Sequence, residues 1–266
     1  MDLQLTGRVA VITGASKGIG LEIVRAFTAE GARVIAASRT LTEELAAIDG
    51  DVIHVAVDLM DAHAPAEVIA RAVELHGGLD VLVNNAGGPP PGVAVPHGGF
   101  LTRTDADWHA VLEFNLLTAV RASRAALPIL VERGGTIVNI ASTAARQPAT
   151  MNLDYAAAKA AMLALTKALS EEFAPQGVRV NAVSPGATIT PWWTDEGGAA
   201  DVFASSAGVD RETALASLAP EMMQLSIGRL ARPSEIADAV AFVASPRCAS
   251  LTGADIQVDS GGLKTV

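Results

Sequence analysis

The sequence predicts a single α/β domain, a doubly wound parallel sheet of about seven strands with helices on both faces. Short apolar runs alternate with longer helical patterns almost to the end of the chain, which is typical of such a sheet. The first run, residues 9–13, has no polar alternation, and this indicates a strand buried on both faces. Half of the 266 residues are hydrophobic, enough to bury one large core, so we expect one domain over residues 1–266.

Each expected element follows from its own pattern. The apolar runs predict strands at 9–13, 33–37, 52–57, 81–84, 136–141, 179–183 and 255–258. The helical patterns lie near 18–29, 64–75, 105–131, 154–174 and 233–244. Two segments interrupt the alternation, the Gly/Pro-rich stretch 87–103 and a long excursion at 187–225. Ligands of open α/β sheets bind beyond the carboxyl ends of the strands, so we expect both segments to lie over a substrate.

Composition excludes several classes of protein. The net charge of −10 argues against a nucleic-acid or anionic-membrane surface. Cys248 is the only cysteine, which excludes an internal disulfide framework and suits a reducing compartment. The first residues lack the apolar stretch of a signal peptide, and we expect a cytoplasmic protein.

Metal chemistry is not predicted. The five histidines are scattered without a ligand pair at helical spacing and without a cysteine partner, so we expect no metal site.

The turn after the first strand predicts an anion site. Thr13 is followed by GASKGIG, in which Gly14 allows a tight turn, Gly18 admits a pyrophosphate and Gly20 lets the next helix approach the sheet. Unpaired N–H groups at that helix's N-terminus would bind the phosphates. The alternative is an ordinary Gly-rich strand–helix turn.

A second motif predicts acid–base chemistry. Tyr155 is the only tyrosine of the chain, and Lys159 follows it by four residues, one turn along the same helical face. A phenol with a pKa near 10 is a poor catalyst at neutral pH, but a neighbouring ammonium group stabilises phenolate and lowers that pKa. The alternative is a buried tyrosine beside a lysine that reaches solvent.

Together these motifs resemble those of the short-chain dehydrogenase/reductase superfamily. The glycine spacing is GxxxGxG, and Asn84-Asn85-Ala86-Gly87 matches the family's NNAG motif residue for residue. The resemblance runs from Leu5 to about Gly262 and implies a Rossmann-like fold that binds NAD(P). The chain departs from most relatives at Ala158, where they carry serine, and in a longer loop at 87–103.

The resemblance also implies roles for further residues. Ser142, thirteen residues before Tyr155, would polarise the substrate carbonyl, with Thr143 as a competitor for this role. Asn115 would hold a water that relays protons through Lys159, unless it simply faces solvent. The residues implied to bind the cofactor are Gly14, Ser16, Lys17, Gly18, Ile19, Gly20, Ser38, Arg39, Asp58, Leu59, Asn85, Ala86, Gly87, Tyr155, Lys159, Pro185, Gly186, Thr188 and Ile189.

The end of the second strand predicts the cofactor. Ser38 stands where relatives that use NAD carry aspartate, and Arg39 follows it. Arg39 and Lys17 would together bind the 2′-phosphate of NADP(H). The alternative is that Arg39 pairs with Glu43 and Lys17 is solvated. Asp58 would bind the adenine amino group or, equally, cap the segment that follows.

Candidate substrate contacts lie in the two interrupting segments. His97 is the histidine within 87–103, and Trp192 and Trp193 are adjacent in 187–225. We expect one tryptophan to cap the core and the other to line the pocket.

The sequence thus predicts an NADP(H)-dependent oxidoreductase that interconverts a ketone, or a 3-oxoacyl group, and a secondary alcohol. The alternatives are an NAD-dependent alcohol or polyol dehydrogenase and a catalytically silent nucleotide-binding protein on the same fold. The expected partner is a small carbonyl or alcohol substrate, and the resemblance implies a homotetramer.

Overall fold

The computed structural model describes residues 1–90 and 99–265. Its core is a seven-stranded sheet in the order β3-β2-β1-β4-β5-β6-β7 with every pair parallel. This order reverses direction between β1 and β4, which creates the switch point where such sheets bind ligands. The predicted fold class is confirmed. The strands are β1 (Val9–Thr13), β2 (Arg33–Ser38), β3 (Val52–Ala56), β4 (Val81–Asn84), β5 (Thr136–Ile140), β6 (Arg179–Pro185) and β7 (Asp255–Val258).

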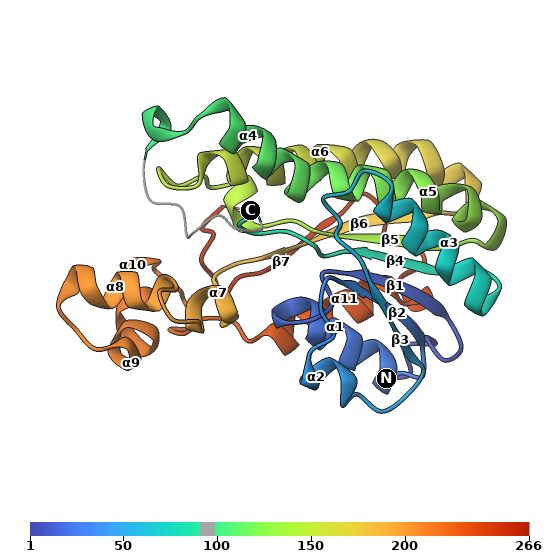
Figure 1. The fold of residues 1–266 in the computed structure, drawn as a ribbon, viewed down its shortest axis with the longest axis horizontal. Helices are drawn as coiled ribbons and strands as arrows, with labels where there is room; N and C mark the ends of the chain where they lie inside the picture. Colours follow the sequence, from blue (N-terminus) through green and yellow to red (C-terminus); the bar gives the residue numbers. More distant parts are fainter. Residues whose placement is uncertain (91–98, 266) are drawn as a thin grey trace.

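Helices cover both faces of the sheet (Figure 1). On one face lie α1 (Gly18–Ala29), the short α2 (Glu43–Ala46) and α11 (Pro233–Ala244). On the other lie α3 (Ala64–His76), α4 (Asp105–Leu112), α5 (Thr118–Arg133) and α6 (Leu153–Phe173). The continuous apolar composition of β1 follows from this double cover, because all five of its residues are buried. The described residues also form 3₁₀ turns: η1 (Phe100–Thr102), η3 (Thr143–Ala145), η4 (Ala174–Gln176) and η6 (Pro246–Cys248).

The helix expected at 105–131 is interrupted. A π-helical turn, η2 (Glu113–Leu117), separates α4 from α5. Asn115 lies in this turn, and its Nδ2 donates to the carbonyl of Val111 at 3.0 Å and to that of Gly88 at 2.9 Å. The Asn115 side chain thus donates to the Val111 carbonyl, which in a regular helix accepts from the backbone N–H of residue 115. π turns of this kind occur often at functional sites.

The segment 187–225 is helical where the sequence predicted an irregular excursion. It contains α7 (Pro191–Thr194), α8 (Ala199–Ala207), α9 (Arg211–Thr213), the π turn η5 (Ala214–Leu218) and α10 (Ala219–Met222). These elements form a lobe beside the carboxyl end of the sheet, with a small apolar core of their own around Trp193 (Figure 1). Such short helices carry too few turns for a periodic signal in the sequence.

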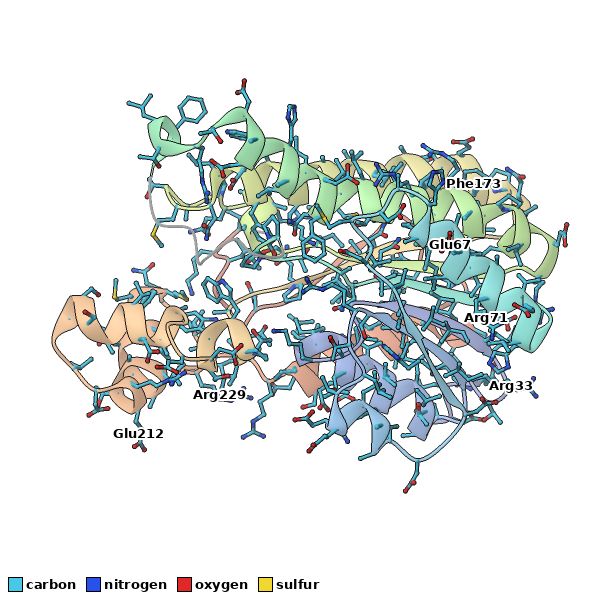
Figure 2. The ribbon with its side chains drawn as sticks, in the orientation of Figure 1. Arg33, Glu67, Arg71, Phe173, Glu212 and Arg229 are labelled. Carbon is cyan, nitrogen blue, oxygen red and sulfur yellow. The ribbon has the colours of Figure 1, made fainter. Side chains whose placement is uncertain are left out.

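The two ends of the sheet face different surroundings. Figure 2 shows Arg33, the first residue of β2, at the end remote from the lobe, whereas Glu212 lies on the lobe itself. Every strand is parallel, so all their carboxyl ends open toward the lobe. The candidate site residues therefore meet there.

One helical run, Asp105–Arg133, is long and apolar enough by length and composition to cross a membrane. Of its most apolar window, 44% is buried inside the protein. A core helix meets the same criterion, so the indication is weak.

Candidate active site

The turn between β1 and α1 has the geometry of a phosphate cradle. Gly14 and Gly18 adopt positive φ angles of 66° and 58°, a region that favours glycine. A Cβ on Gly20 would overlap the carbonyl oxygen of Gly14 and lie 2.5 Å from Nδ2 of Asn85. Lys17, the N-cap residue of α1, provides no side-chain cap, and the first turn of α1 contains no acidic residue. This helix N-terminus therefore fits the pyrophosphate of a dinucleotide.

The two asparagines at the end of β4 connect strand ends. Nδ2 of Asn84 donates to Oδ1 of Asn139 on β5 at 2.8 Å. Nδ2 of Asn85 donates to the carbonyls of Thr13 at 2.8 Å and Gly14 at 3.1 Å. These bonds fix the glycine turn on the neighbouring strand, with Ala86 packed 2.9 Å from the position a Gly14 Cβ would take.

The two cations predicted to bind a 2′-phosphate, Arg39 and Lys17, are both exposed. Arg39 is exposed at the end of β2, and the ion pairs of the described residues include none between Arg39 and Glu43. Lys17 lies 3.9 Å from a carboxylate oxygen of Asp195, and both side chains are largely exposed. Ser38 is buried, and its hydroxyl contacts Nε2 of His54 and the carbonyl of Thr40, both at 3.0 Å.

Asp58, expected either to contact adenine or to cap the following segment, has the capping role. Oδ1 of the exposed Asp58 accepts a hydrogen bond from the Met60 N–H at 3.0 Å, so the carboxylate caps the turn after β3. Leu59 beside it is buried. The second carboxylate oxygen of Asp58 can still accept from an adenine amino group, so that contact stays a proposal.

The segment after β6 lies against the C-terminal strand region. A Cβ on Gly186 would lie 2.7 Å from the Cα of Asp259, so the site requires glycine next to Pro185. Thr188 is buried and donates to the carbonyl of Gly186. The Ile189 N–H donates to the carbonyl of Ala231 at 2.9 Å, since residues 188 and 231 form a β-bridge, and a cofactor contact by the Ile189 backbone stays a prediction.

Three side chains of the predicted catalytic set converge at the carboxyl ends of β4 and β5. Tyr155 and Lys159 share one face of α6, with Nζ of Lys159 5.6 Å from the centroid of the Tyr155 ring. Ser142 lies two residues after the end of β5, and its Oγ accepts a hydrogen bond from the Ala144 N–H. Lys159 is 2% exposed, and its Nζ donates to the carbonyl of Ile140 at the end of β5.

Burial controls the protonation of this set in the chain alone. Desolvation raises the pKa of the Tyr155 phenol above its ordinary value, and hydrogen bonding to Ser142 offsets part of the rise. Desolvation also lowers the pKa of Lys159 to about 8. The lowering of the Tyr155 pKa expected from Lys159 stays a prediction, and burial is the larger influence on the phenol. Of the two hydroxyls considered, Ser142 is the one that lowers the Tyr155 pKa by hydrogen bonding, and its action on a substrate stays a prediction.

Asn115 is fully buried, which excludes the solvent-facing alternative. Its Oδ1 accepts a hydrogen bond from the Gly88 N–H at 2.7 Å. A Cβ on Gly87 would lie 3.0 Å from both Oδ1 of Asn115 and Nζ of Lys159. The amide thus lies beside Lys159 and holds the chain after the NNAG motif, while the predicted water relay stays a prediction.

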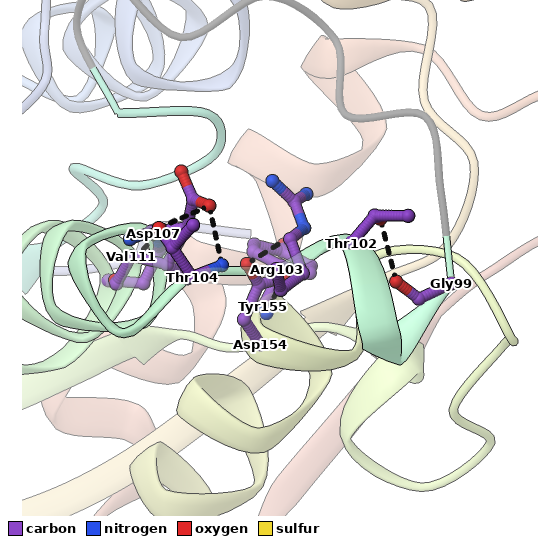
Figure 3. Close-up of polar contacts among 9 residues, drawn as sticks. Gly99, Thr102, Arg103, Thr104, Asp107, Val111, Asp154 and Tyr155 are labelled. Atoms are coloured by element: carbon purple, nitrogen blue, oxygen red, sulfur yellow. Dashed lines mark hydrogen bonds and ion pairs between the residues drawn. The ribbon is translucent and has the colours of Figure 1, made fainter.

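The sequence did not reveal an ion pair beside Tyr155. Arg103 and Asp154 are only 10% and 0% exposed, and Nε of Arg103 lies 3.4 Å from Oδ2 of Asp154 (Figure 3). Oδ1 of Asp154 accepts a hydrogen bond from the backbone N–H of Tyr155 at 2.9 Å. The only signal in the sequence was the acidic residue Asp154 immediately before Tyr155. No local pattern marks Arg103 as its partner.

The adjacent tryptophans differ in burial, one in the core of the lobe and the other partly exposed. Trp193 is 2% exposed in the core of the lobe, whereas Trp192 is partly exposed and packs edge-on against it at 5.2 Å between ring centroids. Substrate contact by Trp192 stays a proposal. His97 lies outside the described residues. Within residues 1–90 and 99–265, no group of three or more potential metal ligands comes together.

A phosphate cradle at the switch point of a parallel sheet, next to a Tyr–Lys pair, defines a nucleotide-dependent oxidoreductase of the α/β class. The model of the short chain dehydrogenase family matches residues 8–220. The chain belongs to the short-chain dehydrogenase/reductase family, and it is an NAD(P)-dependent oxidoreductase that acts on CH–OH groups.

Three known proteins illustrate the range of this similarity. The chain is 33% identical to a 2,5-dichloro-2,5-cyclohexadiene-1,4-diol dehydrogenase of Sphingobium indicum, over 98% of each chain. It is 35% identical to the L-xylulose reductase of Bos taurus over the full length of both. The crystal structure of L-sorbose reductase from Gluconobacter frateurii, complexed with NADPH and L-sorbose, has a TM-score of 0.90, 33% identity and complete coverage of both chains.

Proposed function

We propose that the protein is an NADP(H)-dependent oxidoreductase that interconverts a ketone and a secondary alcohol, with Tyr155 as the general acid/base. The observation that carries the proposal is the convergence of Tyr155, Lys159 and Ser142 at the carboxyl edge of the sheet, beside the phosphate cradle of β1 and α1. Proton transfer by a phenol needs a neighbour that stabilises phenolate, and Lys159 is in position to supply one.

In the reductive direction the side chains of this site have separate tasks. The bound nicotinamide cofactor supplies the hydride. The Ser142 hydroxyl donates to the substrate carbonyl oxygen, which gains negative charge in the transition state. Tyr155 gives its phenolic proton to the same oxygen. Lys159 stabilises the resulting phenolate, and Asn115 orients the segment at Gly87 and Gly88 next to it.

The preference for NADP(H) rests on the end of β2. Ser38 replaces the carboxylate that would repel a 2′-phosphate, and the exposed Arg39 follows it. The similarity to a sorbose reductase that was crystallised with NADPH supports the same preference. The cradle residues Gly14 to Gly20, Asp58 and Thr188 would hold the rest of the cofactor.

One contact favours a second candidate, an NAD-dependent alcohol or polyol dehydrogenase. Lys17 is directed to Asp195 of the lobe rather than left alone for a phosphate. The similarity to a diol dehydrogenase is consistent with this direction of catalysis. In that case Arg39 would be a solvated bystander.

A fluorescence titration of the purified protein with NADPH and then NADH separates these candidates. Tenfold tighter binding of NADPH, about 1.4 kcal/mol, supports the proposal. Equal or tighter binding of NADH favours the dehydrogenase. Binding of neither would support a catalytically silent protein.

The substrate is then sought among ketones with NADPH and alcohols with NAD. L-Sorbose, L-xylulose and acetoacetyl-coenzyme A represent the polyhydroxy ketones and the 3-oxoacyl thioesters. We propose that the described part of 87–103 and the segment 187–225 lie over this substrate, with Trp192 as the candidate contact, since Trp193 is buried in the core of the lobe and His97 lies outside the described residues. We further propose a cytoplasmic homotetramer of single-domain subunits.

A further inference from the structure

Buried polar atoms without partners gather at the start of the catalytic helix. Among the described residues, five buried side-chain N or O atoms lack a hydrogen-bond partner. Three of the five are Nη2 of Arg103, Oδ1 of Asn152 and Oδ2 of Asp154. Burial of unsatisfied polar atoms is costly and persists mainly where function requires it. A buried ion pair is often no more stabilising than apolar side chains of the same volume, so the presence of this set needs an explanation other than stability.

The ion pair between Arg103 and Asp154 joins the starts of two helices (Figure 3). Arg103 immediately precedes the capping box of α4, in which Thr104 and Asp107 bond each other's backbone N–H groups. Asp154 belongs to the first turn of α6, where a carboxylate is favoured by the helix dipole. Through the Tyr155 N–H, the carboxylate is bonded to the backbone of the proposed catalytic residue itself.

This placement has an electrostatic consequence for Tyr155. An uncompensated carboxylate on the adjacent residue would oppose phenolate formation, and the guanidinium of Arg103 cancels that charge. The remaining charges on the neighbouring elements are largely paired. On α6 itself Lys159 faces the ring. After η3, Arg146 pairs with Asp255, and on the π turn Glu113 pairs with Arg121.

We propose that Arg103 is a positioning residue for the reaction: its buried ion pair with Asp154 holds the first turn of α6 and neutralises the carboxylate next to Tyr155. The inference rests on the proposed role of Tyr155. It assigns to Arg103 the neutralisation of Asp154, which no motif or residue spacing in the sequence indicates.

The single tyrosine of the chain allows a direct test without a substrate. Phenolate absorbance in the ultraviolet, followed against pH, reports the ionisation of Tyr155 alone, while circular dichroism shows over which pH range the fold persists. Arg103→Gln leaves Asp154 uncompensated and should raise the midpoint by about half a pH unit to one unit, the effect of a unit charge roughly 10 Å away. Asp154→Asn leaves Arg103 uncompensated and should lower the midpoint by a similar amount.

Two further variants distinguish charge from packing. Arg103→Lys keeps the charge and should leave the midpoint near that of the parent protein. The double variant Arg103→Gln with Asp154→Asn removes both charges and should restore the midpoint that each single change displaces. Arg8→Gln is the control, because it breaks an ion pair with the buried Asp80 at the other end of the strands and should shift nothing.

Opposite shifts that cancel in the double variant support the proposal. Shifts in one direction for both single variants, or none, overturn it, since a purely structural pair would not distinguish the signs. Should one single variant fail to fold, the other and Arg103→Lys still decide the sign.

The proposed role of Tyr155 is tested separately with the panel ketone that NADPH reduces fastest. Should Tyr155→Phe retain activity, the proposed function is wrong. Should that variant be inactive while the midpoints stay fixed, only the role of Arg103 is wrong.

Discussion

The amino and carboxyl ends of the strands differ in how completely their buried charges are paired; they are called the amino edge and the carboxyl edge of the sheet below. At the amino edge, Asp80 is 5% exposed and accepts hydrogen bonds from the Val9 N–H and from Arg8, with Arg133 3.5 Å away. Arg179 donates to four backbone carbonyls at the same edge: Val243, Ala244, Ser245 and Leu251. At the carboxyl edge, Arg103 and Asp154 retain buried atoms without partners, and Lys159 is buried beside a phenol.

This difference suggests that the charges at the amino edge stabilise the fold and that those at the carboxyl edge serve the chemistry. The amino edge also contains a hollow of about 320 Å³, lined in part by Arg8, Asp80 and Arg179. Its charges are engaged with each other and with the backbone, so they have little capacity left for a ligand. The carboxyl edge keeps groups whose hydrogen bonding or protonation is incomplete, and such groups are the ones that can act on a substrate.

The largest expected effect is a loss of activity at the carboxyl edge with little change in stability. Tyr155→Phe should lower kcat/KM about a thousandfold, because the proton donor is lost. The free energy of unfolding and the affinity for NADPH should change little. Steady-state NADPH oxidation, urea unfolding and a fluorescence titration check the three quantities.

The neighbouring hydroxyls provide a matched pair. Ser142→Ala should reduce kcat/KM by about a hundredfold, whereas Thr143→Ala should leave it nearly unchanged. The reverse order would show that Thr143, not Ser142, polarises the carbonyl.

At the amino edge the effect should be reversed, with stability lost and chemistry kept. Asp80→Ala leaves Arg8, Arg133 and the Val9 N–H without their acceptor and should lower the free energy of unfolding by about 3 kcal/mol. Activity per folded molecule should persist. Asp51→Ala is the control, because its pair with Arg33 is half exposed and should contribute less than about 1 kcal/mol. Equal losses in the two variants would remove the contrast between the edges.

A pH titration of stability tests the burial of Lys159. Its pKa falls to about 8 in the folded chain from an ordinary value of 10.5, so between these pH values the unfolded chain binds more protons. The free energy of unfolding should therefore gain a positive contribution from pH 8 toward pH 10, at a slope of at most about 1.4 kcal/mol per pH unit. Urea unfolding at several pH values measures the slope, and Lys159→Met should remove it. An unchanged slope in that variant would assign it to another group.

The smallest effect concerns the cofactor alone. Arg39→Ala should weaken NADPH binding about tenfold and leave NADH binding unchanged, since only the 2′-phosphate distinguishes the two. Lys17→Ala should have a smaller effect because Lys17 already contacts Asp195. Equal affinities of the parent protein for both cofactors would instead support the NAD-dependent candidate.

Local patterns predicted the elements and residues whose roles are local. The buried strand β1 and the glycine turn after it are contiguous in the chain, and Tyr155 and Lys159 share a helical face through spacing alone. Contacts between distant segments could not be predicted in this way. Arg103 meets Asp154 because α4 and α6 pack together, and nothing in either stretch encodes that packing.

Tertiary contacts also added partners that the motifs did not predict. The Ile189 N–H bonds Ala231 on a distant segment, and Ser38 bonds His54 on the neighbouring strand. Burial, a property of the whole fold, raises the pKa of Tyr155, an effect that no local pattern shows.

The π turn around Asn115 has a consequence for how this chain tolerates insertions and deletions. A π turn accommodates one residue more than a regular helix, so the turn at 113–117 absorbs that residue and lets α4 and α5 keep their packing faces. Deleting Phe114 would merge α4 and α5 into one continuous α-helix and remove the wide turn that places the Asn115 amide. The amide would then leave Gly88, although the Asn115 side chain itself had not been altered. A one-codon deletion outside the glycine, NNAG and Tyr–Lys motifs would thus disturb the site as a change within one does.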